Sequence, residues 1–364
     1  MKKLCFFSPI ASPHHVRFCE YLRKYFDAEF YFYDRIGCRQ SFWSVPLGEH
    51  CHILPTKFKW HSRFFTLSVL AVLNKMKPDV ILIGGGLSIP SNYLAYRWGK
   101  KHGARVVVHT ERSRALATGK LRGYTLTWRV LRWLYRDIDR VMVAAEDAVE
   151  QFRDTFRFGD KVVVGHYPCD LDRYCEHPVR SRKDAYTLIY PNRMTEIYNP
   201  IGALEIFVEV LKRHPRTKLL MNASGELRPK VAEWIRAKGV AGSVEFLDNI
   251  RCWDDLGDVY KRSDVMFLPA KFSNGNYTLL ECMASGMVCI TSDKVMGIPK
   301  NYMEPDGAVC VLPLGTDRFV DKICWFLEHP ETFPHVAELN RKAIAHATLA
   351  GTAAVYHELL GDLP

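Results

Sequence analysis

A strand, a small-residue loop and a helix follow one another in residues 263 to 291, and this segment has the chemistry of an anion site. The loop contains Ser273, Asn274, Gly275, Asn276 and Tyr277. Backbone N–H groups at a helix start, next to small residues, suit a diphosphate or a sugar. A solvated turn between a strand and a helix is the plain alternative.

Two charged side chains lie where a nucleotide could contact them. Glu281 falls one turn into the expected helix, where its carboxylate could accept hydrogen bonds from ribose hydroxyls; favourable charge near a helix N-terminus explains it equally well. Arg193 follows an apolar strand that ends at Tyr190, beside Asn192. Its planar guanidinium could bind two phosphate oxygens and neutralise a leaving diphosphate, although an Arg after a strand is often only a surface residue.

Polar residues of the first half also follow apolar runs. His109 ends one of these runs and Glu111 comes two residues later, while His14 and His15 follow the first run of the chain. We expect His109 to hydrogen-bond the acceptor or the donor, and His14, His15 and Glu111 to lie on the acceptor side. A histidine at a strand end is structural in many proteins.

These residues need a scaffold that brings strand ends together. Short apolar runs alternate with helical stretches in both halves, which predicts two parallel sheets flanked by helices. A ligand of such a sheet lies beyond the carboxyl ends of the strands, and this rule also selects Gly225 after the strand 217 to 221. The expected strands are 3–8, 29–33, 80–84, 105–109, 140–144, 161–165, 186–190, 217–221, 244–247, 265–268 and 287–291. The expected helices are 13–25, 90–101, 121–135, 146–156, 200–213, 227–237, 254–261, 278–284 and 317–327.

The length of 364 residues favours two domains of similar size. The polar run from Arg180 to Asp184 breaks the periodicity, so we place the first domain at 1–178 and the second at 184–346. A C-terminal helix at about 347–361 is expected to pack back on the first domain. The predicted fold is α/β, with two doubly wound, Rossmann-like domains that face each other across a cleft.

Cysteine and hydropathy patterns exclude several protein classes. The 11 cysteines show no C-x-x-C pair, which indicates neither a disulfide framework nor a zinc site, and we expect no metal and no bound cofactor. Pro9 and Pro13 interrupt the first apolar run, so it is interpreted as a buried strand rather than a secretion signal. No stretch approaches the roughly 20 apolar residues of a membrane span, which leaves peripheral contact as the only membrane contact expected.

The net charge of +10 concentrates in two segments. Residues 57 to 77 hold five Lys or Arg, no acid and several aromatic residues; residues 112 to 140 hold eight basic residues against Asp137 and Asp139. Residues 57 to 77 and, within the second segment, residues 121 to 136 suit an anionic membrane surface, with ordinary basic surface helices as the alternative. No nucleic-acid recognition motif accompanies the charge, so nucleic acid is not an expected partner.

The second half resembles family 4 of the retaining glycosyltransferases, which have the GT-B architecture and use nucleotide-activated sugars without a required metal. The resemblance is carried by Asp264 and Val265, Leu268 and Pro269, and the string LLECMASG at 279 to 286. Three further segments follow in the family's order, namely IDRVMVAAE at 138–146, CDLDRY at 169–174 and PNRMTE at 191–196.

The resemblance implies roles for three residues. Glu281 matches the second Glu of the family's E-x7-E motif, which binds the ribose, and Arg193 matches the Arg that binds the donor diphosphate. His109 is similar to the cleft His of the first domain. The sequence departs from the family twice: Ser273 replaces the first Glu of the motif, and Tyr198 replaces the Lys that accompanies the Arg. Lys271 or a backbone N–H group is a candidate to substitute for that Lys.

We therefore expect a cytoplasmic retaining glycosyltransferase of the hexosyltransferase type, in contact with the inner face of the cell membrane. It would move a sugar from a nucleoside-diphosphate sugar to a glycan or lipid-linked glycan, in surface polysaccharide, lipopolysaccharide or glycolipid biosynthesis. Arg193 and residues 274 to 277 would stabilise the departing nucleoside diphosphate. The main alternative is a non-catalytic glycosyltransferase-like subunit that binds a glycan or a partner enzyme, and a sugar-nucleotide epimerase also fits the fold. No carboxylate pair for glycoside hydrolysis is evident.

Overall fold

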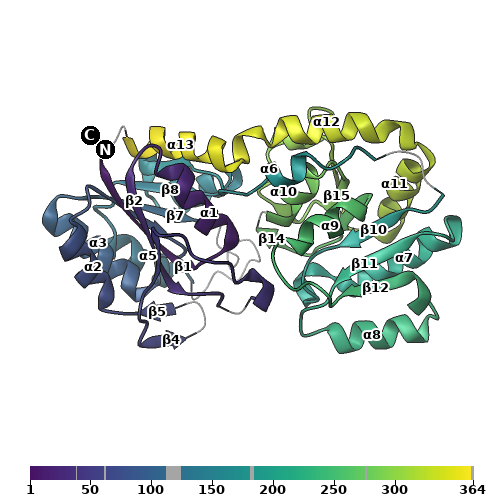
Figure 1. The fold of residues 1–364 in the computed structure, drawn as a ribbon, viewed down its shortest axis with the longest axis horizontal. Coiled ribbons are helices and arrows are strands. Elements are labelled where there is room, and N and C mark those ends of the chain that lie inside the picture. The colour runs from purple at the N-terminus through teal and green to yellow at the C-terminus, as the bar shows by residue number, and fades with distance from the viewer. Residues whose placement is uncertain (38, 61–62, 112–123, 181–183, 275–276, 362–364) are drawn as a thin grey trace. The chain divides into compact units, whose positions relative to one another are not determined.

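Two compact units divide the chain in the computed structural model (Figure 1). The structure describes residues 1–364 except 38, 61–62, 112–123, 181–183, 275–276 and 362–364. The first unit comprises Met1–Asp170 together with the C-terminal segment from Ala347, and the second comprises Leu171–His346. The division falls at 170/171, whereas the sequence placed the end of the first domain at 178.

The first unit contains a seven-stranded parallel sheet in the order β3-β2-β1-β6-β7-β8-β9. The strands are β1 (Lys3–Ile10), β2 (Asp27–Asp34), β3 (Cys51–Ile53), β6 (Val80–Gly84), β7 (Arg105–Thr110), β8 (Arg140–Val143) and β9 (Val162–Val164). The strand order reverses between β1 and β6, so the sheet is doubly wound, and ligands of such sheets bind at this point.

Alternation along the strands divides the apolar core of this unit between the two faces of the sheet. In β1, Cys5 and Phe7 pack under the helices α2 (Ser68–Met76), α3 (Pro90–His102) and α5 (Tyr124–Leu134). Leu4 and Phe6 pack on the other face, under α1 (Pro13–Leu22) and α13 (Leu349–Gly361). The C-terminal helix α13 lies against α1, with the Phe18 and Tyr356 rings 5.2 Å apart.

A six-stranded parallel sheet in the order β12-β11-β10-β13-β15-β17 forms the centre of the second unit. Its strands are β10 (Thr187–Tyr190), β11 (Lys218–Asn222), β12 (Val244–Leu247), β13 (Val265–Leu268), β15 (Val288–Ser292) and β17 (Val309–Leu312). Its helices are α6 (Asp172–Cys175), α7 (Pro200–Arg213), α8 (Arg228–Ala237), α9 (Asp255–Arg262), α10 (Tyr277–Ala284), α11 (Thr316–Glu328) and α12 (Phe333–Ala343). Here too the strand order reverses, between β10 and β13.

Several elements differ from the sequence prediction. Residues 146–156 are not an α-helix but short 3-10 and π turns, Glu146–Ala148 and Gln151–Thr155. The sequence assigned no element to β3, β17 or α12. It also assigned none to the short antiparallel hairpin of β4 (Phe58–Trp60) and β5 (Arg63–Phe65).

Candidate active site

The loops that follow β10 and β11 are joined by backbone hydrogen bonds around Met194. The Met194 N–H donates to the Ser224 carbonyl at 2.7 Å, and the Leu227 N–H donates to the Met194 carbonyl at 2.9 Å. Gly225 lies between these contacts with a φ of +128°, which L side chains rarely adopt. Gly225, which the sequence rule selected, thus lies where two strand-end loops are in contact, and its role in donor binding stays a prediction.

The loop after β13 is tied to the loop after β10 on its other side. The Lys271 N–H donates to the Ile197 carbonyl at 2.8 Å, and the Asn199 side-chain amide donates to the Pro269 carbonyl at 3.1 Å. Because β11, β10 and β13 are neighbours in the sheet, their three loops form one continuous edge at the carboxyl ends of the strands. This edge of the second unit is hereafter called the strand-end edge.

Arg193 is a positive group of the strand-end edge. Its side chain is partly buried, and within the described part of the chain its guanidinium makes no hydrogen bond or ion pair. The neighbouring Asn192 is 8% exposed. A guanidinium without a protein partner keeps its five donors for a ligand, and a diphosphate matches its planar geometry.

The predicted small-residue loop is only partly described. Ser273 and Asn274 form a two-residue strand, β14, beside β16 (Val295–Met296), and Ser273 is 3% exposed. Gly275 and Asn276 lie outside the described residues. Tyr277 is the first residue of α10, so a helix does begin directly after the loop, as the sequence indicated.

Glu281 is buried at 2% exposure, one turn into α10. One carboxylate oxygen accepts a hydrogen bond of 2.8 Å from the hydroxyl of Tyr260 on α9. Burial, followed by the charge of Glu281, raises the pKa of Tyr260 well above its usual value, so Tyr260 stays protonated and donates. The Tyr260 ring packs edge-on against Tyr174 at 5.3 Å. Sequence reasoning missed Tyr260, although a large aromatic residue on the amphipathic segment 254–261 was an available signal.

The expected substitute for the missing Lys takes a different role in this structure. Lys271 forms an ion pair with Glu196 on the surface of the second unit. Tyr198, at the position of the family's Lys, accepts a 3.0 Å hydrogen bond at its carbonyl from the Tyr190 hydroxyl. The Lys271 ammonium would have to leave Glu196 before it could bind a phosphate.

In the first unit, His109 is buried at the end of β7, with 5% of its surface exposed. Burial, followed by the nearby His15, lowers its pKa to about 3, while a hydrogen bond to the backbone of His166 opposes that shift. The imidazole is therefore neutral at physiological pH, packed edge-on against the rings of Tyr167 and Tyr356. A neutral imidazole could exchange hydrogen bonds with a substrate but would supply no charge.

The three predicted acceptor-side residues lie in different surroundings. His15 lies close enough to His109 to lower the pKa of His109. The Nδ1 atom of His15 is 3.0 Å from the Ser12 hydroxyl, and burial lowers the pKa of His15 to about 4. His14 is fully buried, and its Nδ1 accepts a 3.2 Å hydrogen bond from the Asp170 N–H. Glu111, after β7, is exposed. The acceptor-side roles of these three residues stay predictions.

Among the described residues there is neither a metal-binding cluster nor a membrane-spanning helix. In that part of the chain, no group of three or more His, Cys, Asp or Glu side chains is arranged to hold a metal ion. No described helix combines the length and the apolar character needed to cross a bilayer.

Two family models match the chain, one in each half. The model described as glycosyl transferases group 1 matches residues 176–346, and the glycosyl transferase 4-like domain matches residues 13–168. Together they cover nearly all of both units. No curated protein matches the chain.

Solved structures with the same fold cover the whole chain. A glycosyltransferase from Rickettsia africae ESF-5 has a TM-score of 0.70 at 14% identity and covers 99% of each chain. Sucrose-phosphate synthase from Thermosynechococcus elongatus has a TM-score of 0.74 at 12% identity, over 100% of this chain and 99% of the other. Anabaena Alr3699/HepE, solved with UDP and glucose, has a TM-score of 0.73 at 12% identity and covers both chains fully. At these identities the likeness shows the fold, two Rossmann-like domains of the GT-B type.

Proposed function

We propose that this chain, which belongs to the glycosyltransferases of the GT-B fold, transfers a sugar from a nucleoside-diphosphate sugar to a glycan or lipid-linked glycan acceptor. Transfer with retention of anomeric configuration, as in family 4, is part of the proposal. Lipopolysaccharide and other surface glycans are the acceptor class we favour, and a lipopolysaccharide outer core galactosyltransferase is among the proteins with this fold (TM-score 0.64, 16% identity, 99% of each chain).

The observation that carries the proposal is the guanidinium of Arg193 on the strand-end edge, which has no hydrogen-bond or ion-pair partner among the described residues. In the proposed reaction an acceptor hydroxyl oxygen forms a bond to the anomeric carbon as the bond from that carbon to the diphosphate oxygen breaks. The electron pair stays on the diphosphate, which takes up the hydroxyl proton. Arg193 and the backbone around residues 274 to 277 would stabilise the developing negative charge.

Other predicted residues complete the donor site in this proposal. Glu281 would bind the ribose hydroxyls, with Tyr260 fixing the orientation of its carboxylate. Gly225 would allow the diphosphate to approach the backbone, with Asn192 beside it. The neutral His109 would hydrogen-bond a hydroxyl of the sugar or of the acceptor, near His15. No metal and no cofactor are part of the proposal.

Ser273 and Tyr198 support a second candidate. A chain without the first Glu and the Lys of the family could be a non-catalytic subunit that binds a glycan or a partner enzyme. Losing one charged hydrogen bond to phosphate costs roughly 1.5 to 3 kcal/mol, which would weaken donor binding without necessarily removing it. Turnover of a donor by the isolated chain would exclude this candidate.

The proposed location is the cytoplasm, at the inner face of the cell membrane, because nucleotide sugars would be available there and a lipid-linked acceptor would be within reach. The test is release of free nucleoside diphosphate from UDP, GDP and ADP sugars, with and without extracted membrane glycolipid. Release that depends on the acceptor would support transfer. Conversion of the sugar without release would indicate an epimerase, and no turnover with any donor would favour the non-catalytic subunit.

A further inference from the structure

Helix α5 exposes a row of apolar side chains. Leu126, Val130 and Trp133 are 68%, 47% and 63% exposed, and their spacing of four and three residues places them along one side of the helix. Arg129 and Arg132 are also exposed and lie to one side of this row. Within the described residues, neither arginine has a carboxylate partner.

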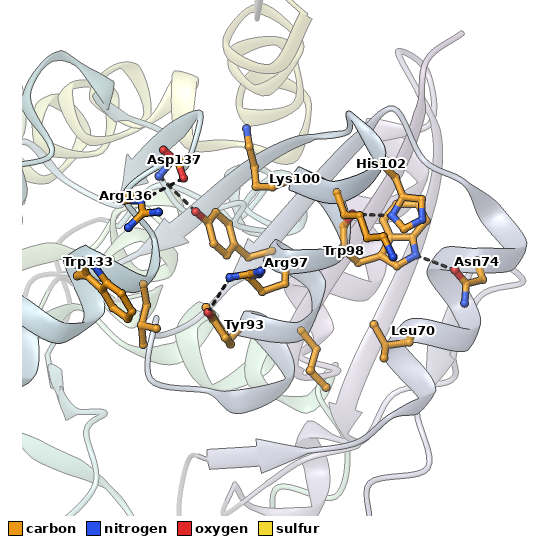
Figure 2. Close-up of a pocket in the computed structure, with 14 residues that line it drawn as sticks. Leu70, Asn74, Tyr93, Arg97, Trp98, Lys100, His102, Trp133, Arg136 and Asp137 are labelled. Carbon is orange, nitrogen blue, oxygen red and sulfur yellow. Dashed lines mark hydrogen bonds and ion pairs between the residues drawn. The ribbon is translucent and has the colours of Figure 1, made fainter.

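The other side of the row borders an open depression of about 760 Å³, lined by residues of α2, α3 and the end of α5. Figure 2 shows Trp133 and Arg136 at one end of it, with Tyr93 and Arg97 of α3 alongside. A depression of this size is within the range of small-molecule sites.

The depression carries excess positive charge. Lys100 is neutralised by Asp139 at 2.9 Å, and Arg136 lies 3.5 Å from Asp137. Arg97 and Lys101, one helical turn apart on α3, have no carboxylate partner in the part of the chain that the structure describes. The apolar row of α5 is thus flanked on each side by two cations that have no carboxylate partner among the described residues, and this surface is hereafter called the α3–α5 face.

The hairpin next to α3 has a similar composition. Phe58, Trp60, Arg63 and Phe65 lie on one face of it because Phe58 pairs with Phe65 and Trp60 with Arg63, and all four are exposed. Phe64 points to the opposite face and is buried. The first basic, aromatic segment therefore also exposes three of its four aromatic side chains, and it contacts α3 through β5.

We propose that the α3–α5 face is the surface by which this chain binds an anionic phospholipid bilayer, with the depression receiving a phosphate-bearing headgroup. Leu126, Val130 and Trp133 would enter the boundary between headgroups and acyl chains, while the flanking cations bind phosphates. A second copy of the chain fits this face poorly, since two copies would bring their unpaired cations together. Nucleic acid would leave Leu126 and Val130 without an apolar partner.

The inference extends the proposed function by naming a membrane surface, and it does not depend on catalysis. Binding of the full chain is measured by flotation with vesicles of phosphatidylcholine alone and with an equimolar mixture of phosphatidylcholine and phosphatidylglycerol. We expect binding to the anionic vesicles, weakened by salt, and little binding to the neutral ones. Binding of UDP, GDP or ADP by the same samples shows separately whether the donor site is intact, so failure of the two proposals can be told apart.

Three double variants test the assignment to this face. Arg129→Gln with Arg132→Gln is expected to weaken binding to anionic vesicles roughly thirtyfold, since each cation near such a surface contributes about 1 kcal/mol. Val130→Ser with Trp133→Ser is expected to abolish flotation. Arg216→Gln with Arg236→Gln, which removes two exposed cations from the second unit, is the matched control and should change binding little.

Equal losses in the control and the face variants would overturn the assignment, because they would indicate attraction by net charge alone. Absence of wild-type binding to anionic vesicles would also overturn it. Light scattering measures whether the α3–α5 face joins two copies of the chain. If the Val130 and Trp133 variant loses self-association but still binds vesicles, the face is a protein interface and the proposal is wrong. All substituted side chains are exposed, so the variants should fold, and their melting temperatures check this.

Discussion

Gly225 lies so close to Met194 that a Cβ atom at position 225 would stand 2.4 Å from the Met194 carbonyl oxygen. The backbones after β10 and β11 are therefore in direct contact, and this contact holds the residue next to Arg193. The position of the Arg193 backbone depends on a glycine in a different loop, 32 residues later in the chain.

Gly225→Ala is expected to destabilise the second unit and to weaken nucleotide binding, because it adds both strain at positive φ and a backbone clash. Gly239→Ala is the matched control: its φ is +68° and no atom lies within 4 Å of an added Cβ, so it adds only the conformational strain, about 1 kcal/mol. Urea unfolding compares the two variants. Equal losses of stability would show that the contact with Met194 relaxes without cost.

Tyr260→Phe is expected to lower the free energy of unfolding by about 1 to 3 kcal/mol, since it removes the 2.8 Å hydrogen bond to the buried Glu281. Tyr135→Phe serves as the control, because the buried hydroxyl of Tyr135 has no hydrogen-bond partner among the described residues. That variant should be neutral or stabilising. If both variants behave alike in urea unfolding, the contact between Tyr260 and Glu281 contributes nothing to stability.

The lowered pKa of His109 predicts that the folded chain loses stability at acidic pH. In the unfolded chain this histidine is protonated near the ordinary histidine pKa of 6.5, whereas in the folded chain, where its pKa is about 3, protonation requires a much lower pH. Since the unfolded state binds more protons between these values, stability falls as the pH is lowered from about 6.5 towards 3. From pH 7 to pH 5 the contribution is about 2 kcal/mol.

His109→Gln should therefore reduce the dependence of unfolding free energy on pH over this range, whatever its effect at pH 7. His15, whose pKa burial lowers to about 4, contributes in the same direction and would keep part of the slope. An unchanged slope in the His109 variant would show that this histidine is protonated in the folded state at mildly acidic pH.

The sequence predicted the strands of both sheets well, because each central strand is a continuous apolar run bounded by polar residues. The bounds of β6, β12 and β13 agree with the expected 80–84, 244–247 and 265–268. The hairpin was not predicted, since three of its four aromatic side chains, Phe58, Trp60 and Phe65, point to solvent and only Phe64 packs in the core. Residues 146–156 have helical spacing, yet the chain forms a 3-10 turn at Glu146–Ala148 and a π turn at Gln151–Thr155 instead of an α-helix.

Only those residues of the candidate site that local sequence can indicate were predicted. The rule that ligands bind beyond strand ends selected Arg193 and Gly225 from local sequence alone. Contacts between distant segments, such as Tyr260 with Glu281 or Lys271 with Glu196, depend on how α9, α10 and the strand-end loops pack. No spacing within one segment indicates them.

Titration calorimetry of UDP, GDP and ADP into the wild-type chain and Arg193→Ala tests the central claim most directly. Because the Arg193 guanidinium has no partner in the described structure, its removal should leave the melting temperature of the free protein unchanged. We expect one nucleoside diphosphate to bind and the variant to lose roughly tenfold to a hundredfold in affinity, the cost of one charged hydrogen bond. Equal affinity in the two proteins would contradict the role of Arg193. No binding by any of the three would contradict the donor site itself and make the non-catalytic subunit the better account.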